Sequence, residues 1–150
     1  MLRVGVAISS LLFCLGGCRK PVDHSPTAAP AFTLTVSSGG GFAGSYQGYT
    51  LASTGEVRAW NSSAAGPRTD RWTVKADPDT LAAFAADLDR FLGTELAQTG
   101  NMTARIEYAS SRGEHHWSIP GAGASADAPE PFRTVYPRIE SYCRNLAPKP

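Results

Sequence analysis

The residues best suited to metal binding or proton transfer form a Glu-His-His cluster at positions 114 to 116. Imidazole and carboxylate groups bind zinc and move protons near neutral pH. The surrounding residues alternate in polarity, which predicts a strand, so His115 and His116 should point to opposite faces of a sheet. Two such histidines cannot hold one metal ion together, and the spacing indicates no third ligand. We therefore expect one histidine to be buried and one exposed, with no metal and no cofactor.

Other patterns typical of enzymes do not occur in the sequence. It contains no HExxH motif, no CxxC pair, no phosphate-binding P-loop and no serine within a G-x-S-x-G turn. The formal net charge is +1, and the basic residues are spread along the chain, so nothing indicates nucleic acid as a partner. We therefore expect a protein that is not an enzyme.

A covalent modification is indicated by the segment from Leu15 to Cys18, which reads Leu-Gly-Gly-Cys. It closes an apolar run that follows a single positive residue, Arg3, as in a secretory signal. The run is too short to cross a bilayer as a helix of about 20 residues. The segment resembles the lipobox of bacterial lipoproteins. This resemblance implies that residues 1–17 are removed and that Cys18 carries the lipid that anchors the protein to a membrane.

Residues 18–30 are predicted to form a tether between this anchor and the folded domain. They contain three prolines and several small residues without an apolar period. At about 3 Å per residue, an extended tether could hold the domain about 30 Å from the membrane. Arg19 stands where many lipoproteins retained in the inner membrane have aspartate. The lipoprotein resemblance therefore implies the bacterial cell envelope, and the outer membrane rather than the inner one.

The three cysteines predict no disulfide within the folded domain. Cys14 would leave with the signal, and the sulfur of Cys18 would be bonded to lipid. Cys143 then remains alone, and free cysteine is among the residues most often buried. Because no base lies near it in the sequence, we expect a small apolar residue on a helix rather than a nucleophile.

Residues 31–150 predict a single α+β domain, in which an antiparallel β-sheet of five to six strands packs against one or two α-helices. Four segments with alternating polarity come first, without a helix between them, and this order favours antiparallel pairing. The expected strands lie at 32–36, 46–51, 56–60, 71–75, 102–108 and 114–119.

Two amphipathic helices are expected to cover the sheet. The first has Asp77 as its N-cap and Pro78 at its first position, and Gly93 provides a stop. Its apolar residues recur every three or four positions, which is typical of a face that packs against a sheet. The second helix should begin near Thr134, because Pro137 fits only its first turn.

A glycine-rich segment joins the first two predicted strands. Phe42 stands alone within a run that can adopt positive φ at almost every position. It could fold back onto the edge of the sheet, or it could project as an anchor for a partner, since aromatic residues carry much of the binding energy of protein interfaces. The candidate partner-binding loop consists of Gly39, Gly40, Gly41, Phe42, Ala43 and Gly44.

The segment Ser38–Gly44 resembles the Ser-Gly-Gly-Phe-Ala-Gly signature of the emfourin family. These small bacterial proteins are typified by inhibitors of thermolysin-like (M4) metallopeptidases. The order of the predicted elements is also similar over roughly Phe32 to Leu146. This chain differs in its third glycine, in an extra strand pair around Trp60 and Trp72, in the long loop before Pro131 and in its expected lipid anchor. The emfourin resemblance implies an inhibitor of a metallopeptidase, and together with the lipobox it implies a membrane-tethered binding module that is not an enzyme.

The alternative is an envelope lipoprotein with a structural or assembly role. Trp60 lies off the face formed by Val57 and Ala59, so we expect it to be exposed and to be a candidate interface residue. A hydrolase or metal enzyme built around His115 or His116 is the least favoured hypothesis.

Overall fold

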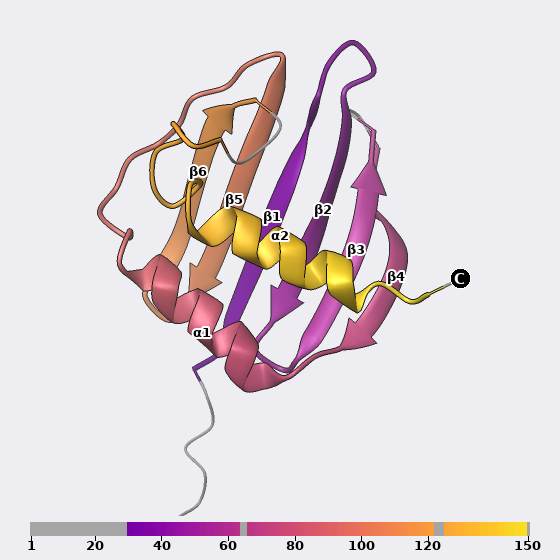
Figure 1. The fold of residues 1–150 in the computed structure, drawn as a ribbon, viewed down its shortest axis with the longest axis vertical. Coiled ribbons are helices and arrows are strands. Elements are labelled where there is room, and N and C mark those ends of the chain that lie inside the picture. Colours follow the sequence, from indigo (N-terminus) through magenta and orange to yellow (C-terminus); the bar gives the residue numbers. More distant parts are fainter. Residues whose placement is uncertain (1–29, 64–65, 122–124, 150) are drawn as a thin grey trace, which may run out of the picture.

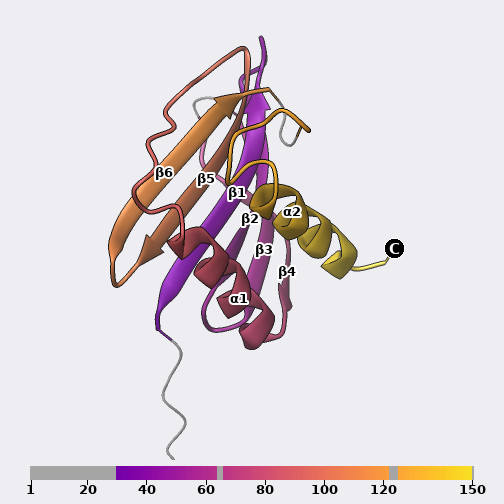
Figure 2. The ribbon, with the colours of Figure 1, turned by 60° about the vertical axis from the view of Figure 1, so that its left-hand side comes forward.

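The computed structural model describes residues 30–63, 66–121 and 125–149, which form one antiparallel sheet covered on one face by two helices (Figures 1 and 2). The six strands lie in the order β4-β3-β2-β1-β5-β6. This arrangement confirms the predicted α+β class. The elements are β1 (Phe32–Gly40), β2 (Ser45–Ala52), β3 (Glu56–Ser62), β4 (Thr69–Lys75), α1 (Pro78–Asp89), β5 (Met102–Ser110), β6 (Gly113–Pro120) and α2 (Val135–Leu146).

Alternating apolar residues of the strands form the core beneath the helices. Leu34, Leu51 and Val57 stand side by side across β1, β2 and β3, and all three are fully buried. Their neighbours in the sequence point to the face that carries no helix, as the period of two in a strand requires. Burial of each such side chain stabilises the fold by about 1.5–3 kcal/mol.

The two helices begin where the sequence predicts. The side chain of Asp77 accepts hydrogen bonds from the backbone N–H groups of Asp79 and Thr80, and Pro78 occupies the first helical position. Helix α1 ends at Asp89, before Gly93, and residues 90–93 form turns. Four residues of α1 reach the core at helical spacing, and they are Leu81, Phe84, Ala85 and Leu88.

The buried face of α2 carries two titratable groups. Cys143 is a free cysteine and is fully buried, as its expected position on a helix predicts. Burial raises the pKa of its thiol to about 12, and the charge on Glu140 adds to this effect. Burial also raises the pKa of Tyr136 to about 12, which keeps its hydroxyl protonated. Both groups are therefore neutral in the folded protein at physiological pH.

Candidate functional site

The glycine-rich turn between β1 and β2 stands at the opposite end of the sheet from the point where the described chain begins (Figure 1). Strand β1 spans nine residues, and eight steps of about 3.3 Å separate its ends by about 26 Å. Pairing continues up to Gly40 and Ser45, and the turn is closed by a hydrogen bond of 3.0 Å from Gly44 N to Gly41 O. The turn is therefore the far tip of the molecule.

Three glycines around this turn have positive φ, with values of +130° at Gly40, +72° at Gly41 and +54° at Gly44. A Cβ added at Gly40 would lie 2.1 Å from the carbonyl oxygen of Asn101, too close for any other residue. Gly41 N also donates to this oxygen at 2.6 Å, which ties the turn to the segment before β5. The conformation of the turn therefore requires glycine at position 40, and hydrogen bonds to Asn101 and within the turn hold it in place.

Phe42 projects from this turn into solvent. Its side chain is 110% exposed. The sequence left open whether Phe42 folds back onto the edge of the sheet or projects from it, and in the structure it projects. Met102 is 38% exposed, and these two are the large apolar residues exposed in the described part of the chain. Met102 pairs with Gly40 across β1 and β5, so it lies beside the base of the turn. Both exposed apolar residues therefore belong to the same tip.

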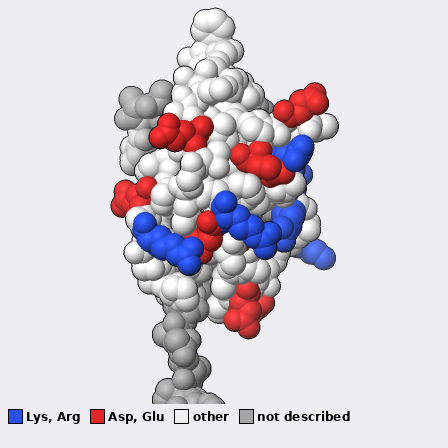
Figure 3. Space-filling model, turned by 90° about the vertical axis from the view of Figure 1, so that its left-hand side faces the viewer, with Lys and Arg blue, Asp and Glu red and all other residues white. Residues whose placement is uncertain are grey.

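The hairpin that carries the tip contains no charged residue. No Asp, Glu, Lys or Arg occurs from residue 31 to residue 55, which includes all of β1 and β2. Figure 3 shows the projecting upper end of the molecule in white, with the charged side chains below it. An open hollow of about 550 Å³ beside the turn is lined by uncharged residues of β1, β2, β3 and β5, including Tyr46, Asn61 and Met102. The turn and the lining of this hollow therefore contain no charged residue, and the guanidinium of Arg105 lies beside them, 4.8 Å from the centroid of the Tyr46 ring.

The expectation that Trp60 is exposed is wrong. Trp60 does lie on the helix-free face of the sheet, but it is only 3% exposed. Its indole occupies the space left by Gly48 on β2, where an added Cβ would stand 2.7 Å from Cζ2 of Trp60. The guanidinium of Arg68 covers the ring at 4.3 Å from its centroid. Trp60 is therefore packed inside the domain and is no longer a candidate interface residue.

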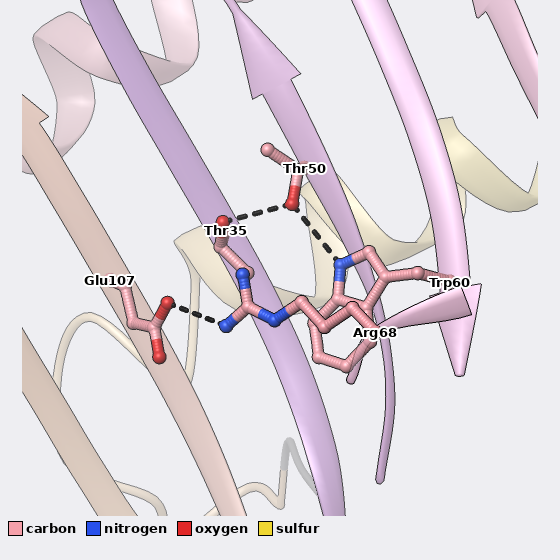
Figure 4. Close-up of polar contacts among 5 residues, drawn as sticks. All are labelled: Thr35, Thr50, Trp60, Arg68 and Glu107. Carbon is pink, nitrogen blue, oxygen red and sulfur yellow. Dashed lines mark hydrogen bonds and ion pairs between the residues drawn. The ribbon is translucent and has the colours of Figure 1, made fainter. Parts of the chain in front are cut away.

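A polar network fixes this tryptophan in place (Figure 4). The indole Nε1–H of Trp60 donates to Thr50 Oγ1 at 3.1 Å, and this hydroxyl forms a second hydrogen bond of 3.0 Å with Thr35 Oγ1. Arg68 reaches across the sheet to Glu107 on β5, with an N–O distance of 3.0 Å. In the sequence, this network is indicated only by Gly48, a glycine inside a strand, and by Arg68, an arginine that follows β3. Neither residue can be matched to Trp60 until the fold is known.

The histidines of the Glu-His-His cluster lie on opposite faces of β6, as predicted. His115 is half-buried and stacks on Trp117, with ring centroids 5.8 Å apart. His116 is exposed on the helix-free face, opposite Glu107. Within the described ranges, no group of three or more His, Cys, Asp or Glu side chains is placed to hold a metal ion.

Cys18 and the segments predicted to be a signal and a tether, up to residue 29, lie outside the described residues, so lipidation stays a prediction. In residues 30–149, as far as they are described, no helix is long and apolar enough to cross a membrane.

Comparison with known protein families finds no family model that matches the chain, and comparison with curated proteins finds no similar one. The likeness to emfourins therefore depends on the glycine motif and on the order of the elements.

Proposed function

We propose that this protein is a membrane-tethered binding module that inhibits a thermolysin-like metallopeptidase of the cell envelope through its β1–β2 turn. The observation that carries the proposal is the fully exposed side chain of Phe42 on a turn whose conformation only glycine permits. An exposed aromatic residue on a fixed turn is well suited to fill a pocket of a partner.

The energetics of such a contact are favourable. Burial of a phenylalanine side chain contributes about 1.5–3 kcal/mol. Because the turn is already ordered by its hydrogen bond to Asn101, little conformational entropy is lost on binding. The uncharged hairpin also avoids the cost of removing charges from water.

The position of the turn agrees with attachment through Cys18. The described chain begins at the end of the sheet opposite to the turn (Figure 1). A lipid on Cys18, followed by a tether of about 30 Å, would therefore present Phe42 away from the membrane surface. In this arrangement the anchor and the binding turn do not compete for space.

The direct test is the activity of a thermolysin-like peptidase with and without a soluble fragment of residues 31–150. This fragment keeps every described core residue, because the core extends from Phe32 to Cys143. We expect inhibition that saturates at a stoichiometric amount of the fragment. A fragment that is folded, but leaves the peptidase fully active at high concentration, would contradict the inhibitor proposal.

Recovery of partners from native membranes separates this function from the structural or assembly role. The full chain and its Phe42→Ala variant serve as paired baits. Recovery of a peptidase by the wild type alone supports inhibition at the turn. Recovery of an envelope assembly complex by both baits would favour the alternative, although the burial of Trp60 removes the residue that first pointed to it.

A further inference from the structure

A second candidate site lies on the helix-covered face of the sheet, separate from the projecting side chain of Phe42. It is a pocket of about 190 Å³ between α2 and strands β1 to β4. Unlike the hollow at the tip, it contains charged groups of both signs. Its side chains include Ser38, Tyr49, Arg71, Tyr136, Glu140 and Arg144.

Arg71 reaches this pocket because β4 is irregular. Ala59 pairs with Trp72, but the next residue, Trp60, pairs with Asp70, so Arg71 has no partner on β3. Strict alternation would place Arg71 on the face opposite to Trp72, whose ring packs against the core beneath the helices. Bulges of this kind change the direction of a side chain and are frequent beside binding sites.

The pocket has a net charge of +1. Arg144 pairs with Glu140 one helical turn away, with an N–O distance of 3.3 Å. Arg71 is exposed and forms no ion pair or side-chain hydrogen bond with any residue that the structure describes. Its guanidinium is therefore free to bind an anion.

The remaining polar side chains of the lining are uncharged and can donate hydrogen bonds. Ser38, Tyr49 and Tyr136, which carry hydroxyl groups, are among the lining residues, and burial raises the pKa of both tyrosines, so each keeps its proton. A planar monoanion matches one free guanidinium with hydroxyl donors around it. A dianion such as phosphate fits less well, because Glu140 would repel its second charge.

We propose that this pocket binds a carboxylate, with the guanidinium of Arg71 as the principal ligand group. The carboxylate belongs either to a small organic acid or to the C-terminus of a peptide, and both present the same two oxygens. The inference goes beyond the proposed inhibition, which uses the turn and not this pocket.

The test is a titration of the ¹⁵N-labelled full chain with propionate, followed by amide chemical shifts. Propionamide, which has the same shape without the charge, is the matched probe. We expect propionate, and not propionamide, to shift the amides of Arg71 and Tyr49. A peptide with a free C-terminal carboxylate, compared with its C-terminal amide, then distinguishes the two sources of the ligand group.

The decisive variant is Arg71→Gln, with Lys75→Gln as its control on the same strand. Both residues are exposed, and Lys75 is not part of the lining. Loss of the guanidinium should weaken carboxylate binding by about tenfold or more, whereas the Lys75 variant should bind as the wild type does. Equal binding by the Arg71 variant and the wild type, or no shift with either carboxylate probe, would overturn the proposal.

Discussion

At Gly40 the backbone has a φ of +130°, and an added Cβ would stand 2.1 Å from the carbonyl oxygen of Asn101. At Gly93, by contrast, an added Cβ would have no atom within 4 Å, and the φ of this residue lies outside the left-handed region. We expect Gly40→Ala to lower the free energy of unfolding by about 2 kcal/mol or more. Gly93→Ala should change it by less than about 0.5 kcal/mol. Urea unfolding of both variants measures the difference, and equal stabilities would show that the turn is not fixed by its glycines.

The aromatic residues Phe42 and Trp60 offer a second matched pair. Trp60 is 3% exposed, whereas Phe42 is 110% exposed. Replacement of Trp60 by alanine should cost about 3–5 kcal/mol, because it leaves a cavity over Gly48 and removes the hydrogen bond to Thr50. Phe42→Ala should leave stability within about 0.5 kcal/mol of the wild type. If Phe42→Ala were the more destabilising variant in thermal and urea unfolding, our assignment of the two roles would be wrong.

These two residues also show what the sequence reveals about single side chains. Strand alternation places Trp60 correctly off the core face, since it points away from the helices. Its burial depends on Gly48 of β2 and on Arg68 after β3, which meet only when the hairpins have formed. For Phe42 the sequence leaves both a folded-back and a projecting position open. In the structure Gly40 pairs with Met102 and Ser45, and Phe42 projects beyond these last paired residues.

Among the elements, α2 carries the two buried groups whose pKa values are raised to about 12. The pKa of Cys143 rises from 9.0, and that of Tyr136 from 10.0, to about 12 on folding. Each group is neutral in the folded state, and the unfolded chain releases its protons first as pH rises. Their contribution to stability is therefore complete below pH 9 and is lost between pH 9 and 12.

Urea midpoints measured from neutral to alkaline pH should therefore fall once the pH exceeds 9. Cys143→Ala should reduce the slope in the first part of that range, because the variant has no thiol to ionise. The native thiol should also resist iodoacetamide at pH values where the urea-unfolded protein reacts completely. A stability that stays constant from pH 9 to pH 12 would show that Cys143 and Tyr136 are not buried by α2. Rapid labelling of Cys143 in the native protein would show the same for the thiol.

The types of the elements were predictable from local patterns, but some of their limits were not. Strand β1 was expected to end at Val36, yet it continues to Gly40. It continues because β2 and β5 pair with it on both sides over Ser37 to Gly40, and these backbone hydrogen bonds outweigh the low strand preference of glycine. The bulge that leaves Arg71 unpaired in β4 likewise has no signal in the local sequence.

For the whole molecule, the strand order depends on one long-range choice. Strand β5 returns to pair with β1, so the hairpin that carries the turn lies at the centre of the sheet. The residues of this pair lie about seventy positions apart, and periodicity gives no information about such a contact. The same choice brings Asn101 and Met102 to the turn, which fixes its conformation and completes the apolar tip.

Our central claim is that the fixed turn presents Phe42 as the anchor for a peptidase, and the inhibition constant of Phe42→Ala tests it most directly. The variant is compared with the wild type and with Ala43→Ser, which alters the same exposed turn and keeps the phenyl ring. We predict that loss of the ring weakens inhibition on the order of 30-fold, corresponding to about 2 kcal/mol. The Ala43 variant should inhibit as the wild type does. Equal inhibition constants for the wild type and Phe42→Ala would contradict the claim.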